Sequence, residues 1–250
     1  MTGFRSFAIV AAIVSIGGGS ARAQEPALVA DVSEHLVAIT SGFTGKEVLL
    51  FGSTDGPGDI AVVVKGPTGD ETVRKKTRFG PIWINSDSVT FRDVPSFYRI
   101  ASSRPLEEFA PEALLSRFQI GEEYLRLETE GENPEPARVS EFRDALIRIK
   151  TKDRLYDESL GAVNMMSNRL FRTSLFFPAN VPTGTYFVEV YLFRNGSVAS
   201  AEIVPFNISK IGFGADVYDF AHRFSWIYGL LAIALAVGAG WVAGALFKRS

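Results

Sequence analysis

The chain has 250 residues, no cysteine and nearly balanced charge, with 26 Lys and Arg against 28 Asp and Glu. The lack of cysteine excludes a disulfide-held scaffold, so a folded domain of this chain depends on its apolar core. Only two histidines are present, and His and Cys are the ligands that transition metals prefer. We therefore expect neither a metal site nor a cofactor.

The first 23 residues have the pattern of a secretory signal peptide. Arg5 precedes an apolar run at 7–16, and small residues follow as far as Ala21-Arg22-Ala23. The Ala-x-Ala pattern predicts cleavage after Ala23, with an uncleaved anchor as the alternative. Residues 1–23 are therefore interpreted as a signal peptide that exports the segment behind it.

The exported part carries a negative excess. Once the signal peptide and the last three residues are set aside, 22 basic residues remain against 28 acidic ones, a net charge of −6. Such a surface does not favour nucleic acid or anionic lipid headgroups. The local exception is a basic cluster of Arg74, Lys75, Lys76 and Arg78. It is interpreted as a solvated face or, alternatively, as a loop that binds an anion or a lipid headgroup.

The first exported segment, 24–102, has the pattern of an antiparallel β-sheet, with short apolar runs that end in turns rich in Gly and Pro. The runs are 27–32, 36–40, 47–51 and 59–65. Further strands of the same module are predicted at 81–84 and 88–91, with Trp83 as a core aromatic. Strands spaced by ~8–12 residues are typical of a β-sandwich.

The middle segment, 103–168, is interpreted as a helical insertion. Residues 105–118 and 138–156 show apolar residues at helical spacing with charged opposite faces. In the second stretch Phe142, Leu146, Ile149 and Tyr156 mark the apolar face, and Ser140 is a natural N-cap. We expect the insertion either to pack on an edge of the sandwich or to form a small lobe of its own.

The β pattern returns at 169–212. The predicted strands are 170–177, 185–193 and 198–208, and the favoured Asn-Gly hairpin pair separates the last two. Within the middle strand, Tyr186, Val188, Val190 and Leu192 are the better candidates for the buried face. The predicted fold class is mainly β: an immunoglobulin-like antiparallel β-sandwich with a helical insertion, followed by one C-terminal transmembrane helix.

Residues 224–247 predict that transmembrane helix. The segment contains no charged residue, and at ~1.5 Å per residue it is long enough for a hydrocarbon core of ~30 Å. Lys248 and Arg249 follow at once, so the positive-inside rule places the short tail 248–250 in the cytoplasm. The sandwich then lies on the other side of the membrane.

The juxtamembrane segment, 213–223, holds the first candidate contact site, formed by Tyr218, Asp219 and His222. One interpretation is an ordinary belt of aromatic and polar residues at the membrane surface. The other is a docking surface, in which Asp219 and His222, three residues apart on one helical face, pair with a membrane partner and titrate.

The second candidate contact lies inside the predicted span. Ala232, Ala236, Gly240 and Gly244 recur every four residues and form a ridge of small side chains. Such a ridge allows another helix to approach closely. It is interpreted as a packing site for a partner helix or a second copy of this chain, or as part of a plain anchor.

Several segments resemble the alphaproteobacterial transmembrane protein family labelled Alph_Pro_TM. They are LLFGSTDGPGD at 49–59, VPSFY at 94–98, ASSRP at 101–105, FPANVPTGTY at 177–186 and VYDFAH at 217–222. The resemblance covers nearly the whole exported chain and implies a bacterial inner membrane with a periplasmic domain. It brings no assigned activity and no catalytic residue. An association of such proteins with sulfite-exporter-type permeases would fit an accessory role.

Two classes of function stay open. The sequence contains none of the usual nucleophile or nucleotide-binding motifs, so we expect a non-enzymatic binding or accessory protein that serves a partner such as a multi-pass transporter. The alternative is a membrane-tethered enzyme whose carboxylates do acid–base work, for example Glu122 with Glu123 or Asp153 with Asp157. A deep pocket that gathers such carboxylates with Arg or His would favour the enzyme.

Overall fold

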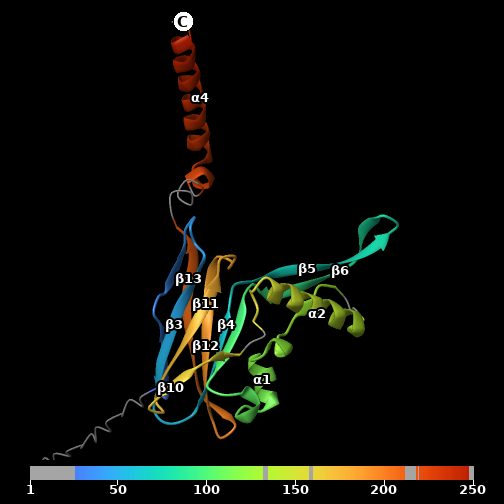
Figure 1. Ribbon diagram of the computed structural model, residues 1–250, viewed down its shortest axis with the longest axis vertical. Helices are drawn as coiled ribbons and strands as arrows, with labels where there is room; N and C mark the ends of the chain where they lie inside the picture. The colour runs from blue at the N-terminus through green and yellow to red at the C-terminus, as the bar shows by residue number, and fades with distance from the viewer. Residues whose placement is uncertain (1–25, 132–134, 158–159, 212–217, 219, 248–250) are drawn as a thin grey trace, which may run out of the picture.

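The computed structural model describes residues 26–131, 135–157, 160–211, 218 and 220–247. The predicted signal peptide and the tail 248–250 lie outside the described residues. Figure 1 shows a β-sandwich, an arm that projects from its side, and a long helix beyond one end of the sandwich. The prediction of a mainly β chain with helices and one apolar C-terminal helix is confirmed.

Two sheets build the sandwich. The first has the order β1-β3-β11-β10 and the second the order β2-β13-β12-β4-β7-β9. The first contains β1 (Leu28–Val32), β3 (Gly45–Thr54), β11 (Leu170–Pro178) and β10 (Asn164–Met166). The second contains β2 (Leu36–Ile39), β13 (Ser197–Lys210), β12 (Gly184–Arg194), β4 (Asp59–Lys65), β7 (Tyr98–Ser102) and β9 (Gly161–Ala162). Neighbouring strands are antiparallel except β13 with β2 and β7 with β9.

The core of the sandwich follows the alternation of the strands. The predicted buried face of β12 is confirmed, since Tyr186, Val188, Val190 and Leu192 are fully buried. The ring of Phe177 contacts those of Phe97, Tyr186 and Phe206, with centroids 5.1 to 5.8 Å apart. The Tyr186 hydroxyl also donates to the Pro182 carbonyl at 2.6 Å. This tyrosine therefore ties the start of β12 to the loop before it.

Strand β4 is buried on both faces, with an unbroken buried run from Ile60 to Val64. Its second face is covered by the segment after β7, which contains η1 (Leu106–Glu108), α1 (Glu112–Phe118) and η2 (Glu122–Tyr124). Ring contacts bind this layer to the sheet, with Phe109 on Phe193 and Phe118 on Tyr191. A continuous apolar strand is expected where layers cover both sides of a sheet.

Helix α2 (Pro136–Lys152) begins four residues before the predicted cap. The prediction of Ser140 as N-cap is wrong, because Pro136 occupies the first turn, where its fixed φ and missing N–H suit a helix start. Phe142 and Leu146 are buried as predicted, but Ile149 is 47 % exposed and Lys150 takes the next buried position. Tyr156 is buried beyond the end of the helix.

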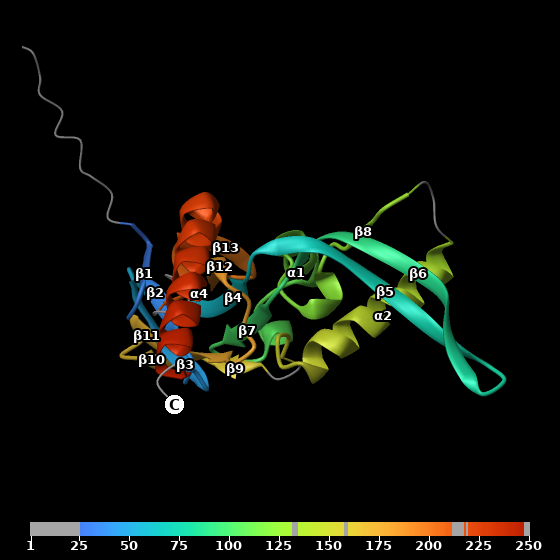
Figure 2. The ribbon, with the colours of Figure 1, turned by 90° about the horizontal axis from the view of Figure 1, so that it is seen from above.

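The arm is defined here as β5 (Thr68–Phe79), β6 (Ile82–Pro95), β8 (Glu128–Thr129) and α2. Its three strands form a separate sheet in the order β5-β6-β8. A second apolar core lies between this sheet and the helix, and consists of Val73, Val89, Phe91, Val94, Phe142 and Leu146. Figures 1 and 2 show the β5–β6 hairpin reaching sideways from the sandwich, with α2 along its base.

Two predictions for this region are wrong. Residues 81–84 and 88–91 belong to the arm and not to the sandwich, and Trp83 is 65 % exposed instead of being a core aromatic. The alternation of a strand tells which residues share a face. It does not tell whether another layer covers that face, and no described layer covers Trp83.

Helix α4 (Ser225–Phe247) matches the predicted span closely. Residues Ser225–Gly244 are long and apolar enough to cross a membrane, and the apolar window within them is not buried against the rest of the protein. The helix follows soon after β13 ends at Lys210, so a membrane crossed by α4 would lie at that end of the sandwich. We refer to it as the membrane-proximal end.

Candidate functional site: the projecting arm

The tip of the arm is a tight two-residue turn. Gly80 has φ +61° and Pro81 follows it. A type II′ hairpin turn needs a positive φ at its first central position, which Gly supplies freely, and a φ near −65° suits Pro at the second. The sequence therefore fixes a sharp end to the hairpin, with Phe79 and Ile82 as the pair that flanks the turn.

The side chains change from apolar to basic with distance from the turn. The first pair is Phe79 with Ile82, the second Arg78 with Trp83, the third Thr77 with Ile84, and the fourth Lys76 with Asn85. The exposed fractions of Phe79, Ile82, Trp83 and Ile84 are 71, 56, 65 and 44 %. Phe79, Ile82 and Ile84 share one face of the hairpin and Trp83 lies on the other. No described layer covers these large apolar side chains, a pattern that marks contact sites on proteins.

The tip is also strongly basic. Residues 72–86 contain Arg74, Lys75, Lys76 and Arg78 and no acidic residue. Lys75 pairs with Glu141 of α2, whereas the other three form no ion pair with any described residue. The Arg78 Nε donates to the Gly80 carbonyl at 3.0 Å and so stays beside the turn. The tip thus carries two positive charges, Lys76 and Arg78, that no described acidic side chain pairs, and Arg74 adds a third nearer the base of the hairpin.

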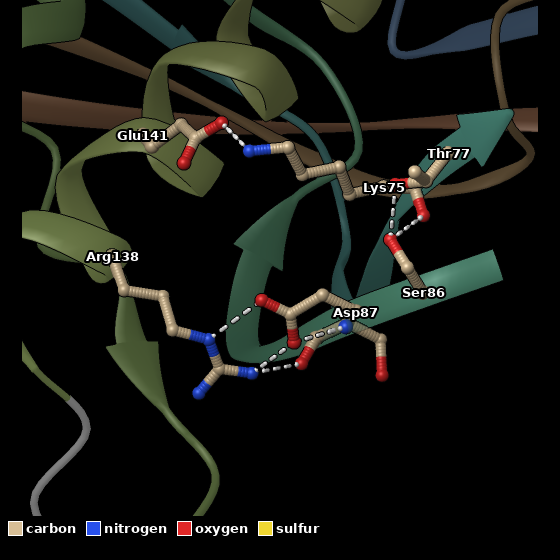
Figure 3. Close-up of polar contacts among 7 residues, drawn as sticks. Lys75, Thr77, Ser86, Asp87, Arg138 and Glu141 are labelled. Carbon is tan, nitrogen blue, oxygen red and sulfur yellow. Dashed lines mark hydrogen bonds and ion pairs between the residues drawn. The ribbon is translucent and has the colours of Figure 1, made fainter.

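Ion pairs join the base of the hairpin to α2, as Figure 3 shows. The Lys75 Nζ donates to Glu141 Oε1 at 2.5 Å. The Arg138 guanidinium donates to both carboxylate oxygens of Asp87, at 2.5 and 2.9 Å, and to the Ser88 carbonyl at 2.9 Å. This hydrogen bonding holds the pKa of Asp87 below its usual range. A bidentate pair fixes orientation as well as distance, so the helix holds the hairpin in one direction.

One further pair lies closer to the second core. Lys150 of α2 is buried, and its Nζ donates to Glu71 Oε1 of β5 at 2.5 Å. A buried ammonium needs such a partner, because an unpaired charge in an apolar setting is costly. The pair therefore sets the register between the last turns of α2 and the start of the hairpin.

The hairpin leaves the sandwich at its membrane-proximal end. Strand β4 ends at Lys65, and the following Pro67 lies against Gly184, the first residue of β12. Gly184 in turn pairs with Ile208, near the end of β13. The chain thus enters the arm and α4 from the same end of the sandwich.

A cleft of about 940 Å³ lies at the opposite end, beside the turn 55–59 and the β12–β13 hairpin. Its charged side chains are largely paired with each other. The Arg104 Nε donates to Asp59 Oδ1 at 2.7 Å, and Arg194 pairs with Asp55. The hydrogen bond from Arg194 lowers the pKa of Asp55. Glu107, Glu108 and the rings of Phe109 and Phe193 also line the cleft.

The carboxylates proposed from sequence for catalysis do not meet in this cleft. The backbone carbonyls of Glu122 and Glu123 accept hydrogen bonds from Arg143, Asp153 ends α2, and Asp157 pairs with the half-buried Arg99 at 3.3 Å. Burial lowers the pKa of Arg99. Within the described ranges, no group of three or more His, Cys, Asp or Glu side chains could hold a metal ion.

The predicted contacts near the membrane are only partly described. Asp219 lies outside the described residues, so its pairing with His222 stays a prediction. His222 Nδ1 lies 2.9 Å from the Tyr218 carbonyl, and the two rings stack at 4.0 Å. A methyl group added at Gly240 or Gly244 would meet nothing within 4 Å. The ridge of Ala232, Ala236, Gly240 and Gly244 is therefore open to another helix.

Sequence reasoning found the basic cluster of the arm but not its apolar tip. The missed residues are Phe79, Ile82 and Ile84, and Trp83 was assigned to the core. A usable signal was present, because Phe-Gly-Pro-Ile combines a turn with flanking apolar residues directly after four bases. A strand in a core has no need of such a basic flank.

The comparisons with known proteins agree with the apolar helix α4. The family model described as "Putative transmembrane protein (Alph_Pro_TM)" matches residues 27–249. No curated protein matches the chain. No solved structure matches it either. Because the family match extends from the first described strand through the whole of α4, the chain belongs to the Alph_Pro_TM family of transmembrane proteins.

Proposed function

We propose that this chain is a single-pass protein of a bacterial inner membrane, with its sandwich and arm in the periplasm, and that it is a non-enzymatic accessory subunit of a multi-pass partner such as a permease. The apolar helix α4 and the Lys248-Arg249 pair behind it support this topology. The family match supports the membrane location.

The arm is the observation that carries the accessory role. A simple anchored domain has no need of a second core, three ion pairs to α2 and a hairpin that extends sideways. Such a structure extends the surface of the protein along the membrane instead of away from it (Figure 2). It gives the protein a second attachment point at a distance from α4, which is what a subunit needs to hold a fixed orientation beside a partner.

The test is recovery of the partner from native membranes. Full-length protein is cross-linked lightly, extracted in mild detergent and analysed by mass spectrometry, beside a Gly240→Leu, Gly244→Leu variant. Leucine at the ridge blocks close helix approach, so a multi-pass transport protein should come with the wild type and be lost with the variant. Gly238→Leu is the matched control, since Gly238 lies on the other side of α4 and is equally open.

Recovery of no membrane protein, or of a second copy of this chain alone, would contradict the accessory role. Equal recovery of the partner with the wild type and the ridge variant would show that the partner contacts a part of the protein other than the ridge of α4. Either result is independent of how the arm behaves, because none of these substitutions lies in it.

A second candidate function is that of an enzyme. It is favoured by the cleft beside the turn 55–59, which gathers Asp55, Asp59, Glu107 and Glu108 with two arginines. An enzyme that uses carboxylates would place its acid–base pair there. A general acid needs a raised pKa, however, and Arg194 lowers that of Asp55. A compound that stays bound to the purified full-length protein in native mass spectrometry, and is lost with Glu107→Gln and Glu108→Gln, would favour this function.

A further inference from the structure

We propose that the tip of the β5–β6 hairpin docks into the surface of the bilayer that α4 crosses. In this arrangement Phe79 and Ile82 enter the headgroup region, while Arg78 and Lys76 bind anionic phospholipid headgroups. The inference rests on the proposed function only in placing the sandwich and the arm on one side of a membrane crossed by α4.

The order of side chains along the hairpin fits the polarity of a membrane surface. Residues 79–82, at the end of the hairpin, carry no polar side chain. Arg78 and Trp83 form the next pair, and Lys76 lies further back. Tryptophan and arginine are suited to the interface, because each has an apolar body with a polar end that reaches water or phosphate. A short apolar end with bases behind it is typical of a segment that enters a membrane surface without crossing it.

The position of the tip fits the same surface. The hairpin starts at the membrane-proximal end of the sandwich, because Pro67 lies against Gly184 and Gly184 pairs with Ile208. From there it runs outward and toward the α4 end, so that the tip lies level with the end of the sandwich from which the chain passes to α4 (Figure 1). Figure 2 shows the tip displaced sideways from the axis of α4. A membrane around α4 therefore extends over the tip.

Charge complementarity indicates that the surface to which the tip binds is an anionic bilayer. The exported part of the chain has a net charge of −6, whereas residues 72–86 contain four bases and no acid. Lys76 and Arg78 at the tip form no ion pair with a described residue, so their charges are available to bind another surface. Each Lys or Arg near an anionic membrane strengthens attachment by about fivefold.

The arm holds the tip in place before any lipid is bound. Arg138 donates two hydrogen bonds to Asp87, and Lys75 pairs with Glu141 on the next turn of α2. Both pairs lie on the hairpin between its tip and the second core. A surface that is preorganised loses less conformational entropy on docking.

The experiment follows the fluorescence of Trp83 in the full-length protein. The other two tryptophans, Trp226 and Trp241, lie in α4 and are replaced by Phe. The protein is reconstituted in nanodiscs of phosphatidylcholine with or without phosphatidylglycerol. Quenching of Trp83 is measured with lipids brominated near the headgroup end of the chain and with aqueous iodide. In discs with phosphatidylglycerol, we expect brominated lipid to quench Trp83 and iodide to reach it poorly.

Two variants and one control separate the contributions. Phe79→Ser with Ile82→Ser should abolish lipid quenching and restore access to iodide. Lys76→Gln with Arg78→Gln should lower the ratio of docked to free tips by about 25-fold in anionic discs and leave neutral discs unchanged. Phe51→Ser is the control, since Phe51 is an exposed phenylalanine on β3 of the sandwich. It should change nothing. All these side chains are exposed, so hydrogen exchange in α2 should confirm that the arm stays folded in each variant.

Iodide access to Trp83 that is as high in anionic discs as in detergent would overturn the proposal. So would protection of Trp83 that appears only in native membranes containing a cross-linked partner, which would make the tip a protein-binding surface. Partner recovery with the α4 variants is measured separately, so failure of the lipid contact can be told apart from failure of the accessory role.

Discussion

The sandwich and the arm are both built from antiparallel strands around an apolar core, but they differ in what covers their strands. In the sandwich, β4 lies between a sheet on one side and α1 with its neighbours on the other, and its run Ile60 to Val64 is fully enclosed. In the arm, α2 covers the base of the hairpin, and no described part of the chain covers its tip. The apolar residues of the tip therefore do not serve the stability of the fold, and a binding role explains them better.

The contacts that hold the centre of the sandwich and the arm differ as well. The aromatic centre of the sandwich is held by ring packing around Phe177. The arm has a second core of six residues and adds three ion pairs between its hairpin and α2. Exposed ion pairs contribute little free energy but fix orientation when they are bidentate. The ion pairs of the arm thus fix the direction of the hairpin relative to α2, whereas ring packing stabilises the core of the sandwich.

Removal of the central aromatic ring should give the largest effect. Phe177→Ala leaves a cavity among three other rings, so we expect a loss of about 3–5 kcal/mol in the free energy of unfolding. The loss should affect the whole sandwich, measured by chemical denaturation of the full-length protein in detergent. Phe176→Ala is the control, because the neighbouring Phe176 is 43 % exposed. An equal loss of unfolding free energy for both variants would contradict the assignment of Phe177 to the core and Phe176 to the surface.

Truncation in the second core should have a smaller and local effect. Leu146→Ala removes a buried side chain between α2 and the hairpin, at a cost of about 2 kcal/mol. Hydrogen exchange should rise in Pro136–Lys152 and in β5 and β6, and stay unchanged in the sandwich. Ile149→Ala on the exposed side of the same helix should leave exchange as it is. A rise throughout the sandwich would show that the two regions form one cooperative unit.

Acid should produce the smallest change in the arm, at the Arg138–Asp87 contact. The hydrogen bonds from Arg138 lower the pKa of Asp87 from its ordinary value of 3.8. A depressed carboxyl pKa stabilises the fold above the ordinary value and loses that contribution as pH falls through the lower one. Protection of α2 from exchange should therefore be constant from neutral pH to about pH 4 and fall only below it.

An NMR titration of the Asp87 carboxyl carbon measures this directly. Its midpoint should lie below 3.8 in the wild type and return to the ordinary range in Arg138→Gln. A midpoint that is the same in both proteins would mean that the pair of Figure 3 does not orient the hairpin in solution.

Local patterns predicted most elements of the sandwich. Alternation located the buried face of β12, and the Asn195-Gly196 pair located the hairpin that follows it, where both residues have positive φ. These predictions succeed because turn chemistry and strand period are properties of a few adjacent residues. The predicted start of α2 is wrong because a local signal was considered alone. Ser140 is a good cap in isolation, but Pro136 begins the helix earlier.

The candidate site could be predicted only in part. The basic residues of the hairpin are visible in the sequence, and so is the ridge of α4. The exposure of Trp83 is indicated only by the turn and the basic flank beside it, because Ile82-Trp83-Ile84 by itself has the composition of a strand in a core. The immunoglobulin-like connectivity and the pairing of Asp219 with His222 stay predictions.

The sequence alone determined the class of the fold, the apolar helix α4 and the family, because each depends on residues that are adjacent or regularly spaced. The tertiary structure alone decided that β5 and β6 leave the sandwich, that α2 supports them, and that the arm and α4 start from the same end. These facts depend on which layers cover which faces, through contacts such as Lys150 with Glu71, 79 residues apart. No local pattern carries that information, because a strand has the same period whether its faces are covered or exposed.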